Sequence, residues 1–230
     1  MTTDAPRIGL IHALEESVIP ARGAFREEWP EARIFDLMDT SLSVDHAERG
    51  ALDAEMTGRF LTLGRYASGT RGRGDTAAGI LFTCSAFGPA IEAVKGELSI
   101  PVFKPNEAAF DEAVALGGRI AVLVSFRPSL PPLLAELAEA GKQKGKPVEA
   151  FGIIADGALE ALKAGRPEEH DARVVAAAVA AERADTIILG QFSLARAKDA
   201  VAKATGTRVI TTPHAAVRAL KRAIAAKAAG

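Results

Sequence analysis

The most informative stretch of this chain is residues 80–89, which read Ile-Leu-Phe-Thr-Cys-Ser-Ala-Phe-Gly-Pro. The apolar run at the start is typical of a buried strand, and Pro89 is typical of a helix start. Cys84 therefore lies where a strand leads into a helix. In an open α/β sheet, ligands bind at the carboxyl ends of strands, and a helix N-terminus favours a thiolate. This position predicts a reactive cysteine, and the alternative is a small buried hydrophobic residue.

Short apolar runs alternate with segments of helical periodicity along the whole chain. We expect strands at residues 7–13, 33–37, 78–83, 101–103, 119–125, 148–154, 186–189 and 208–211. We expect helices at residues 20–28, 44–66, 89–98, 106–116, 128–142, 156–163, 168–183 and 194–204, and a last one from residue 213. Strands that alternate with helices of this length predict an α/β fold with mainly parallel sheets covered on both faces.

The second half of the chain repeats the first with an offset of 107 residues, so that Cys84 corresponds to Gln191. We therefore predict two pseudo-symmetric Rossmann-like halves, residues 1–117 and 118–230, with the last helix of the first half free to pack on the other half. A two-fold arrangement would turn the Cys84 loop and the Gln191 loop towards each other. We expect the active site in the cleft between the halves.

Composition limits the classes of function. The 230 residues are 48% hydrophobic, which is enough for a substantial core. The chain has 28 basic and 29 acidic residues, so there is no basic excess and we expect no nucleic-acid partner. No segment approaches the roughly 18 continuous apolar residues of a membrane span. The short polar N-terminus and the single cysteine lead us to expect a cytoplasmic protein without membrane association.

Two segments carry a resemblance to a known family. They are Leu-Phe-Thr-Cys-Ser-Ala-Phe-Gly at residues 81–88 and Ile-Leu-Gly-Gln-Phe-Ser at residues 188–193. With the duplicated α/β halves, they make the chain similar to the aspartate/glutamate/hydantoin racemase superfamily, which also includes maleate isomerase and arylmalonate decarboxylase. The resemblance implies a racemase or isomerase that acts beside a carboxylate or carbonyl of a small substrate. It also implies that no metal or organic cofactor is used.

The resemblance gives Cys84 a role. In the family's two-base racemases each half supplies one cysteine, and a thiolate removes a proton while a thiol returns one from the other face. Cys84 matches the first cysteine, as a thiolate base or, in a reaction like maleate isomerisation, as a nucleophile. We expect the helix that begins near Pro89 to lower its pKa. The second cysteine is missing, because residues 190–193 offer no acid or base near neutral pH.

The resemblance also implies that backbone N–H groups and short hydroxyl side chains at strand ends hold the substrate carboxylate. The matching substrate-binding candidates are Thr83, Ser85, Ala86, Ser125, Gln191, Phe192, Ser193 and Thr212. His12, at the end of the first strand, and His214, at a helix start in the half without a cysteine, are candidates for the second acid. Each of these residues has an ordinary alternative as a helix cap, a turn former or a solvated side chain.

Three hypotheses about function stay open. The first is a racemase or isomerase that uses Cys84. The second is a one-base tautomerase or a decarboxylase, although the family's decarboxylases keep their cysteine at the other site. The third is a protein that binds a small carboxylate without converting it. The four histidines lack the spacing of metal ligands, so we expect no metal site, and the apolar residues of the 44–66 helix permit a homodimer.

Overall fold

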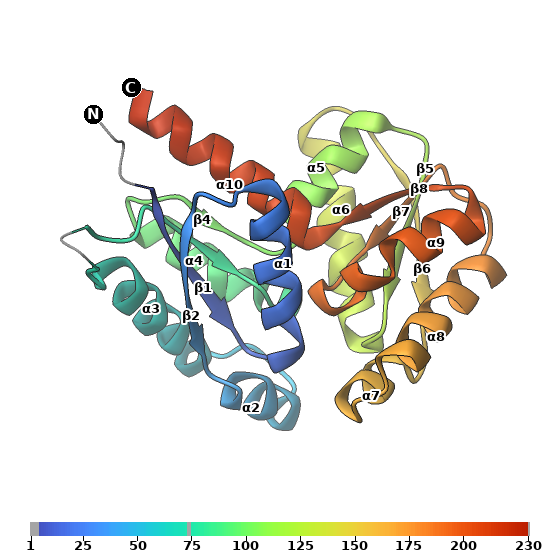
Figure 1. Cartoon of the computed structure of the whole chain (residues 1–230), viewed down its shortest axis with the longest axis horizontal. Helices are drawn as coiled ribbons and strands as arrows, with labels where there is room; N and C mark the ends of the chain where they lie inside the picture. Colours follow the sequence, from blue (N-terminus) through green and yellow to red (C-terminus); the bar gives the residue numbers. More distant parts are fainter. Residues whose placement is uncertain (1–4, 73–74, 230) are drawn as a thin grey trace. The chain divides into compact units, whose positions relative to one another are not determined.

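A computed structural model describes residues 5–72 and 75–229 (Figure 1). The strands are β1 (Arg7–His12), β2 (Arg33–Met38), β3 (Gly79–Phe82), β4 (Val102–Phe103), β5 (Arg119–Val124), β6 (Glu149–Ile154), β7 (Thr186–Leu189) and β8 (Arg208–Thr211). The α-helices are α1 (Val18–Glu28), α2 (Ser41–Arg49), α3 (Ala54–Gly69), α4 (Gly88–Glu97), α5 (Glu107–Leu116), α6 (Leu130–Gln143), α7 (Ala158–Lys163), α8 (Pro167–Ala180), α9 (Lys198–Thr205) and α10 (Thr212–Ala229). Short 3-10 helices are η1 (Glu15–Ser17), η2 (Ser85–Phe87), η3 (Arg127–Ser129) and η4 (Phe192–Ala197).

The strands form two four-stranded parallel sheets, with the orders β2-β1-β3-β4 and β6-β5-β7-β8. The predicted α/β class with two similar halves is confirmed. Strand β3 corresponds to β7, and all four residues of each are buried. Strands buried on both faces read as continuous apolar runs, which is why these two were visible in the sequence.

The chain forms two compact units. The first unit comprises residues 1–105 and 216–230, and the second comprises residues 106–215. The last helix of each sequence half thus belongs mainly to the unit of the other half: α5 lies in the second unit, and most of α10 lies in the first. This division differs from the boundary expected between residues 117 and 118. In the first unit, Leu220 and Ile224 of α10 pack so closely on Gly79 that a Cβ there would lie 2.9 Å from each.

The sheet of the first unit separates two sets of side chains. Helices α3 and α4 cover one face, and α1 lies on the other (Figure 1). On the α3 face, the ring of Phe60 lies 5.5 Å from that of Phe82 and 4.8 Å from that of Phe87. Because side chains alternate along a strand, Phe82 and Cys84 face α3, whereas Thr83 faces α1.

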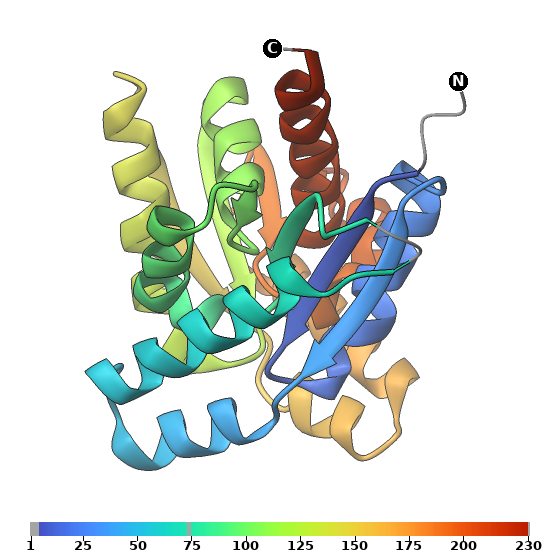
Figure 2. The same ribbon diagram turned by 90° about the vertical axis from the view of Figure 1, so that its left-hand side faces the viewer.

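The single helix expected at residues 44–66 is wrong, because the chain forms two helices there. Helix α2 ends at Gly50, which adopts a left-handed conformation with φ of 71°, and α3 begins after Asp53. The Asp53 carboxylate accepts a hydrogen bond of 2.8 Å from the N–H of Met56, as an N-cap does. The chain reverses direction between the two helices (Figure 2).

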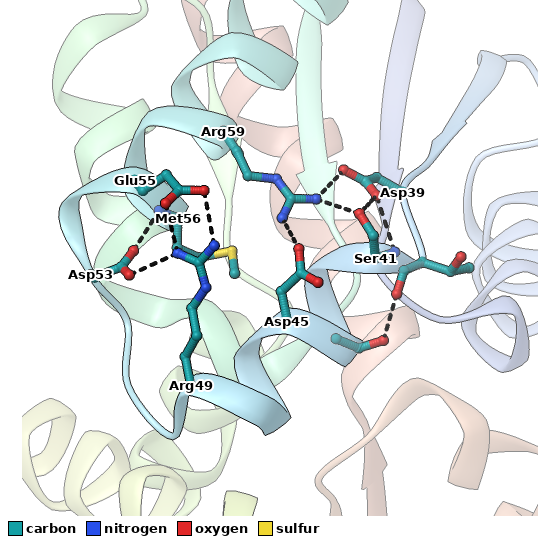
Figure 3. A network of polar contacts seen from close by, with 10 residues as sticks. Asp39, Ser41, Asp45, Arg49, Asp53, Glu55, Met56 and Arg59 are labelled. Carbon is teal, nitrogen blue, oxygen red and sulfur yellow. Dashed lines mark hydrogen bonds and ion pairs between the residues drawn. The ribbon is translucent and has the colours of Figure 1, made fainter.

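Arginine side chains hold this helix pair together (Figure 3). The network consists of Asp39, Ser41, Asp45, Arg49, Asp53, Glu55, Met56 and Arg59. Arg59 of α3 bonds the carboxylate of Asp39, in the β2–α2 connection, and that of Asp45, within α2. The N–H of Asp39 donates to the carbonyl of His12 over 3.0 Å. The helix pair is thereby fixed to the carboxyl end of β1.

The second unit has the same layered plan. Its core on one face joins β5 and β7 to α8 and α9, and α5 and α6 pack with the other face (Figure 1). The helix expected at residues 194–204 is found in two parts, since η4 precedes α9. No helix in the part of the chain that the structure describes is long and apolar enough to cross a membrane.

Candidate functional site

Cys84 lies at the carboxyl end of β3 and directly before η2, which leads into α4 at Gly88. Its backbone is extended, with φ of −110° and ψ of 123°. The residue is partly exposed and packs against the aromatic cluster of Phe60, Phe82 and Phe87. The expected position of the thiol between a strand and a helix start is confirmed.

The environment of the Cys84 thiol is apolar. The gap beside it is lined by Ile11, His12, Ala13, Leu42, Phe60, Phe82 and Cys84 and has no room for a water molecule. Burial raises the pKa of the thiol from about 9 to about 11, and the N–H of Ala86 offsets only part of this effect. The expectation that the helix start lowers this pKa is therefore wrong, because the effect of burial is larger. Near pH 7 only about one thiol in 10⁴ is ionised.

Alkylation should report this raised pKa. The rate at which iodoacetamide modifies Cys84 is expected to rise with pH to a midpoint of about 11 in the folded protein, and of about 9 in guanidinium chloride. Because the folded pKa lies above the unfolded one, the stability that Cys84 contributes is present below about pH 9 and is lost as the pH rises to about 11. Urea unfolding of the wild type and Cys84→Ala across this range measures that loss. A folded-state midpoint below about pH 8.5 would contradict this account.

A chain of hydrogen bonds lies on the other face of the same sheet. The Nδ1 atom of His12 is 2.9 Å from Thr83 Oγ1, and its Nε2 atom is 3.0 Å from Asp36 Oδ1. The second oxygen of Asp36 accepts a bond of 3.0 Å from Arg22 Nε of α1. His12 is fully buried and Thr83 nearly so. The alternative that placed His12 in a solvated loop is wrong, because the buried imidazole joins Thr83, directly after β3, to Asp36 of β2.

Burial and the neighbouring charged groups set the protonation states of His12 and Asp36. Burial lowers the pKa of His12, and the neighbouring Asp36 carboxylate only partly opposes this effect. Burial alone would raise the pKa of Asp36, but the bonds from Arg22 and His12 outweigh it, and the pKa is lowered. Near neutral pH, Asp36 is therefore a carboxylate and His12 is a neutral imidazole.

In the second unit, Gln191 follows β7 as Cys84 follows β3. Its Oε1 atom accepts three hydrogen bonds, from the N–H of Ser125 (2.7 Å), the hydroxyl of Ser125 (2.9 Å) and the N–H of Phe126 (3.3 Å). Backbone N–H groups only donate, so they fix the orientation of the carboxamide. Its Nε2 atom lies 3.5 Å from Ser129 Oγ. Gln191 can thus offer only N–H donors to a ligand. The N–H and hydroxyl of Ser125 already donate to Gln191.

The turn that carries Gln191 is fixed from several sides. The N–H of Gly190 donates to the carbonyl of Leu123 over 2.8 Å, and Asn106 Nδ2 donates to the carbonyl of Gly190 over 2.8 Å. A Cβ at residue 190 would lie 3.2 Å from that same Leu123 carbonyl, which explains the glycine. The hydroxyl of Thr212 donates to the carbonyl of Leu189, so this predicted ligand residue has a structural partner.

The other predicted site residues are distributed as follows. Ser85 and Ala86 form the first turn of η2, beside the thiol. Phe192 and Ser193 are buried in η4. His214 lies in the first turn of α10, with its Nδ1 atom 2.5 Å from Thr211 Oγ1. Their predicted roles toward a substrate stay predictions. Among residues 5–72 and 75–229, no group of three His, Cys, Asp or Glu side chains is arranged to hold a metal ion.

Comparison with known proteins identifies the family. The model of the Asp/Glu/Hydantoin racemase family matches residues 39–220. The chain belongs to this family. A search of curated proteins finds no match by sequence. The range that the racemase family model matches includes Cys84 and Gln191, but it begins after His12 and Asp36.

Solved structures show the same two-unit fold. Glutamate racemase isoform RacE1 from Bacillus anthracis aligns with a TM-score of 0.71 and 16% identity, over 97% of this chain and 83% of the other. Allantoin racemase from Pseudomonas fluorescens aligns with a TM-score of 0.69 and 18% identity, over 96% and 92%. Unliganded arylmalonate decarboxylase aligns with a TM-score of 0.57 and 18% identity, over 96% and 93%. At these identities the likeness shows the fold of the Asp/Glu/hydantoin racemase family and nothing finer.

The sequence did not reveal the residues that orient the side chains of this racemase-family site. Asp36 and Arg22 fix His12, and Asn106 fixes the turn before Gln191. One signal was present, since Asp36 interrupts the apolar run of residues 34–38, and a carboxylate inside such a run needs a partner. Asn106 gave no comparable signal, because asparagine at a helix start is ordinary.

Proposed function

We propose that this protein is a cofactor-independent isomerase of the Asp/Glu/hydantoin racemase family. It acts at the carbon beside a carboxylate or carbonyl of a small substrate, and Cys84 exchanges a proton with that carbon. The observation that supports this proposal most is the position of Cys84 at the carboxyl end of a buried parallel strand, where ligands of open α/β sheets bind. A family model that matches residues 39–220 adds to it.

The raised pKa of Cys84 decides in which form the thiol starts. The raised pKa keeps Cys84 as S–H near neutral pH, so the thiol is ready to give a proton and must lose one before it can take one. In an exchange cycle, the thiolate removes the proton from carbon, becomes S–H, and returns a proton to the planar intermediate, whereas inversion needs a second acid on the opposite face. Backbone N–H groups near Ser85 and Ala86 would stabilise the charge that develops on the substrate oxygen.

The same observation favours a second candidate, a one-base tautomerase or a decarboxylase. When carbon dioxide leaves a substituted malonate, the electron pair of the broken bond remains on carbon. The S–H of Cys84 can donate its proton there directly, and water then restores the proton of the thiolate. This route starts from the protonated thiol that burial favours.

Gln191 leads to a prediction about stereochemistry. A locked carboxamide cannot deliver a proton, so proton removal and return are both expected on the face of Cys84. For a chiral substrate in D2O, deuterium incorporation should exceed inversion by about 10²-fold or more, since general acid–base catalysis contributes that much. NMR measures incorporation, and chiral chromatography measures inversion. Gln191→Cys should raise inversion, with Gln143→Cys on the surface of α6 as the control.

Equal rates of incorporation and inversion in the wild type would contradict the one-face account. They would indicate that another residue, such as His214, supplies the second acid.

A third candidate, a protein that binds a carboxylate without turnover, predicts saturable binding and no exchange in wild type or Cys84→Ser. The cleft between the units, a homodimer and a cytoplasmic location remain predictions. Size-exclusion chromatography with light scattering measures the molar mass of the protein in solution and so tests the predicted homodimer.

A further inference from the structure

Helix α2 covers the apolar side of the Cys84 thiol with very little apolar surface of its own. Leu42 is fully buried and lines the gap beside Cys84, and it is the one buried residue of α2. One turn later, the ring of His46 lies 5.2 Å from that of Phe87. The remaining residues of α2 are exposed or half-buried. An element with so few buried apolar contacts opens more easily than the strands of a core.

Ion pairs hold α2 in this position. The guanidinium of Arg59 in α3 donates to the Asp39 carboxylate over 2.8 Å and also pairs with Asp45 of α2 (Figure 3). Asp39 is fixed to the sheet, because its N–H donates to the carbonyl of His12 over 3.0 Å. Its carboxylate also accepts a bond of 3.1 Å from the N–H of Ser41, the first residue of α2. Arg59, Asp39 and Asp45 form what we call the Arg59 clasp, which joins α2 to α3 and to the carboxyl end of β1.

The Arg59 clasp is only partly shielded from solvent. The side chains of Arg59, Asp39 and Asp45 are 25%, 29% and 32% exposed. Burial alone would raise the pKa of Asp39, but the bonds from Ser41 and Arg59 outweigh it and lower the pKa. Asp39 is therefore a carboxylate near neutral pH. Dissolved salt screens charges that solvent reaches, so the strength of the clasp should depend on the salt concentration.

We infer that the Arg59 clasp keeps α2 closed over the apolar side of Cys84, and that its opening controls the access of water and small reagents to the thiol. The gap beside Cys84 has no room for a water molecule, so Leu42 must move before a molecule enters from that side. Arg59 is a positioning residue, because it acts on the thiol only through α2. The inference goes beyond the proposed function and does not depend on turnover.

Alkylation by iodoacetamide at a fixed pH tests this access without any substrate. Arg59→Met should raise the alkylation rate of Cys84 about tenfold, the effect of losing one charge-assisted hydrogen bond. Water that enters the gap stabilises the thiolate and acts in the same direction. Asp45→Asn removes only the partner on α2 and should also raise the rate. Arg59→Lys keeps the positive charge, so its rate should lie between those of the wild type and Arg59→Met.

Arg119 of the second unit offers a matched control. It too pairs with two carboxylates, those of Glu149 and Glu182, and its side chain is 32% exposed. Arg119→Met should lower the free energy of unfolding in urea about as much as Arg59→Met does. It should nevertheless leave the alkylation rate of Cys84 within about twofold of the wild type, because α2 keeps its clasp. A general loss of stability would instead raise the rate equally in both variants.

Salt and hydrogen exchange report on the clasp itself. Raising the salt concentration from about 0.02 M to about 0.5 M should speed alkylation severalfold in the wild type and leave Arg59→Met unchanged. Iodoacetamide is uncharged, so screening does not alter its own approach to the thiol. Mass spectrometry should show faster amide hydrogen exchange of residues 41–49 in Arg59→Met than in the wild type or Arg119→Met.

The results that would overturn the inference are distinct from those that bear on catalysis. Alkylation at the wild-type rate in both Arg59→Met and Asp45→Asn would overturn it. A faster rate without faster hydrogen exchange of residues 41–49 would also do so, because access would then not depend on α2. Neither result touches the proposed function, which is tested by proton exchange with Cys84→Ser. Absence of that exchange would contradict the proposed function and leave the role of the Arg59 clasp standing.

Discussion

Replacing Cys84 with alanine is expected to slow deuterium exchange at the substrate carbon by about 10²–10⁴-fold, the range that a positioned acid or base contributes. Cys84 is the one residue at the carboxyl end of β3 whose side chain changes protonation state in the accessible pH range. The partner position, Gln191, has no such group. The rate is measured by proton NMR in D2O on a substrate that the wild type exchanges.

Two controls show whether a slower rate comes from loss of the thiol. Cys84→Ser keeps the size and a hydrogen-bonding group but has a hydroxyl that does not ionise near neutral pH, so it should be as slow as Cys84→Ala. Ligand affinity should stay within a few fold of the wild type in both variants, which shows that the site is still formed. Exchange at the wild-type rate in either variant would remove Cys84 from the reaction.

Replacing Phe60 with alanine is expected to lower the free energy of unfolding by about 3–5 kcal/mol, as large aromatic deletions in a core do. Phe60 is 2% exposed, and its ring packs on Phe82 and Phe87. It also lines the gap beside Cys84. Water admitted there would stabilise the thiolate, so the alkylation midpoint of Cys84 should fall from about 11 towards 9.

A matched variant separates stability from this local effect. Phe25 of α1 is equally buried but stacks on Trp29, away from the Cys84 gap. Phe25→Ala should destabilise the protein by a similar amount in urea unfolding and leave the alkylation midpoint of Cys84 unchanged. If both variants shift the midpoint equally, the raised pKa depends on general stability and not on the apolar gap.

Much of the fold followed from local pattern. Strands β3 and β7 were found because both are short apolar runs, and the offset between them revealed the duplication. The error at residues 44–66 came from following apolar periodicity across a break. Gly50 and Asp53 signalled that break as a C-terminal glycine and an N-cap, and reading them would have separated α2 from α3.

Less of the site could be predicted from the sequence, because its properties depend on residues that are far apart in the chain. The pKa of Cys84 is set by side chains such as Leu42 and Phe60, which only the tertiary fold brings to it. The bond from His12 to Asp36 depends on how β1 and β2 pair, and one sequence does not give that register. The helix start beside Cys84 was recognised correctly, but the effect of burial on the thiol outweighs it.

The most direct test of Cys84 as a proton-exchanging thiol is proton NMR in D2O with a panel of chiral 2-amino, 2-hydroxy and 2-aryl carboxylates, hydantoins, maleate and substituted malonates. Each compound is followed with wild type and with Cys84→Ser. We expect at least one compound to gain deuterium at the carbon beside its carboxylate or carbonyl, to isomerise, or to lose carbon dioxide, with the wild type only. Identical spectra with both proteins, for compounds that bind, would contradict the account.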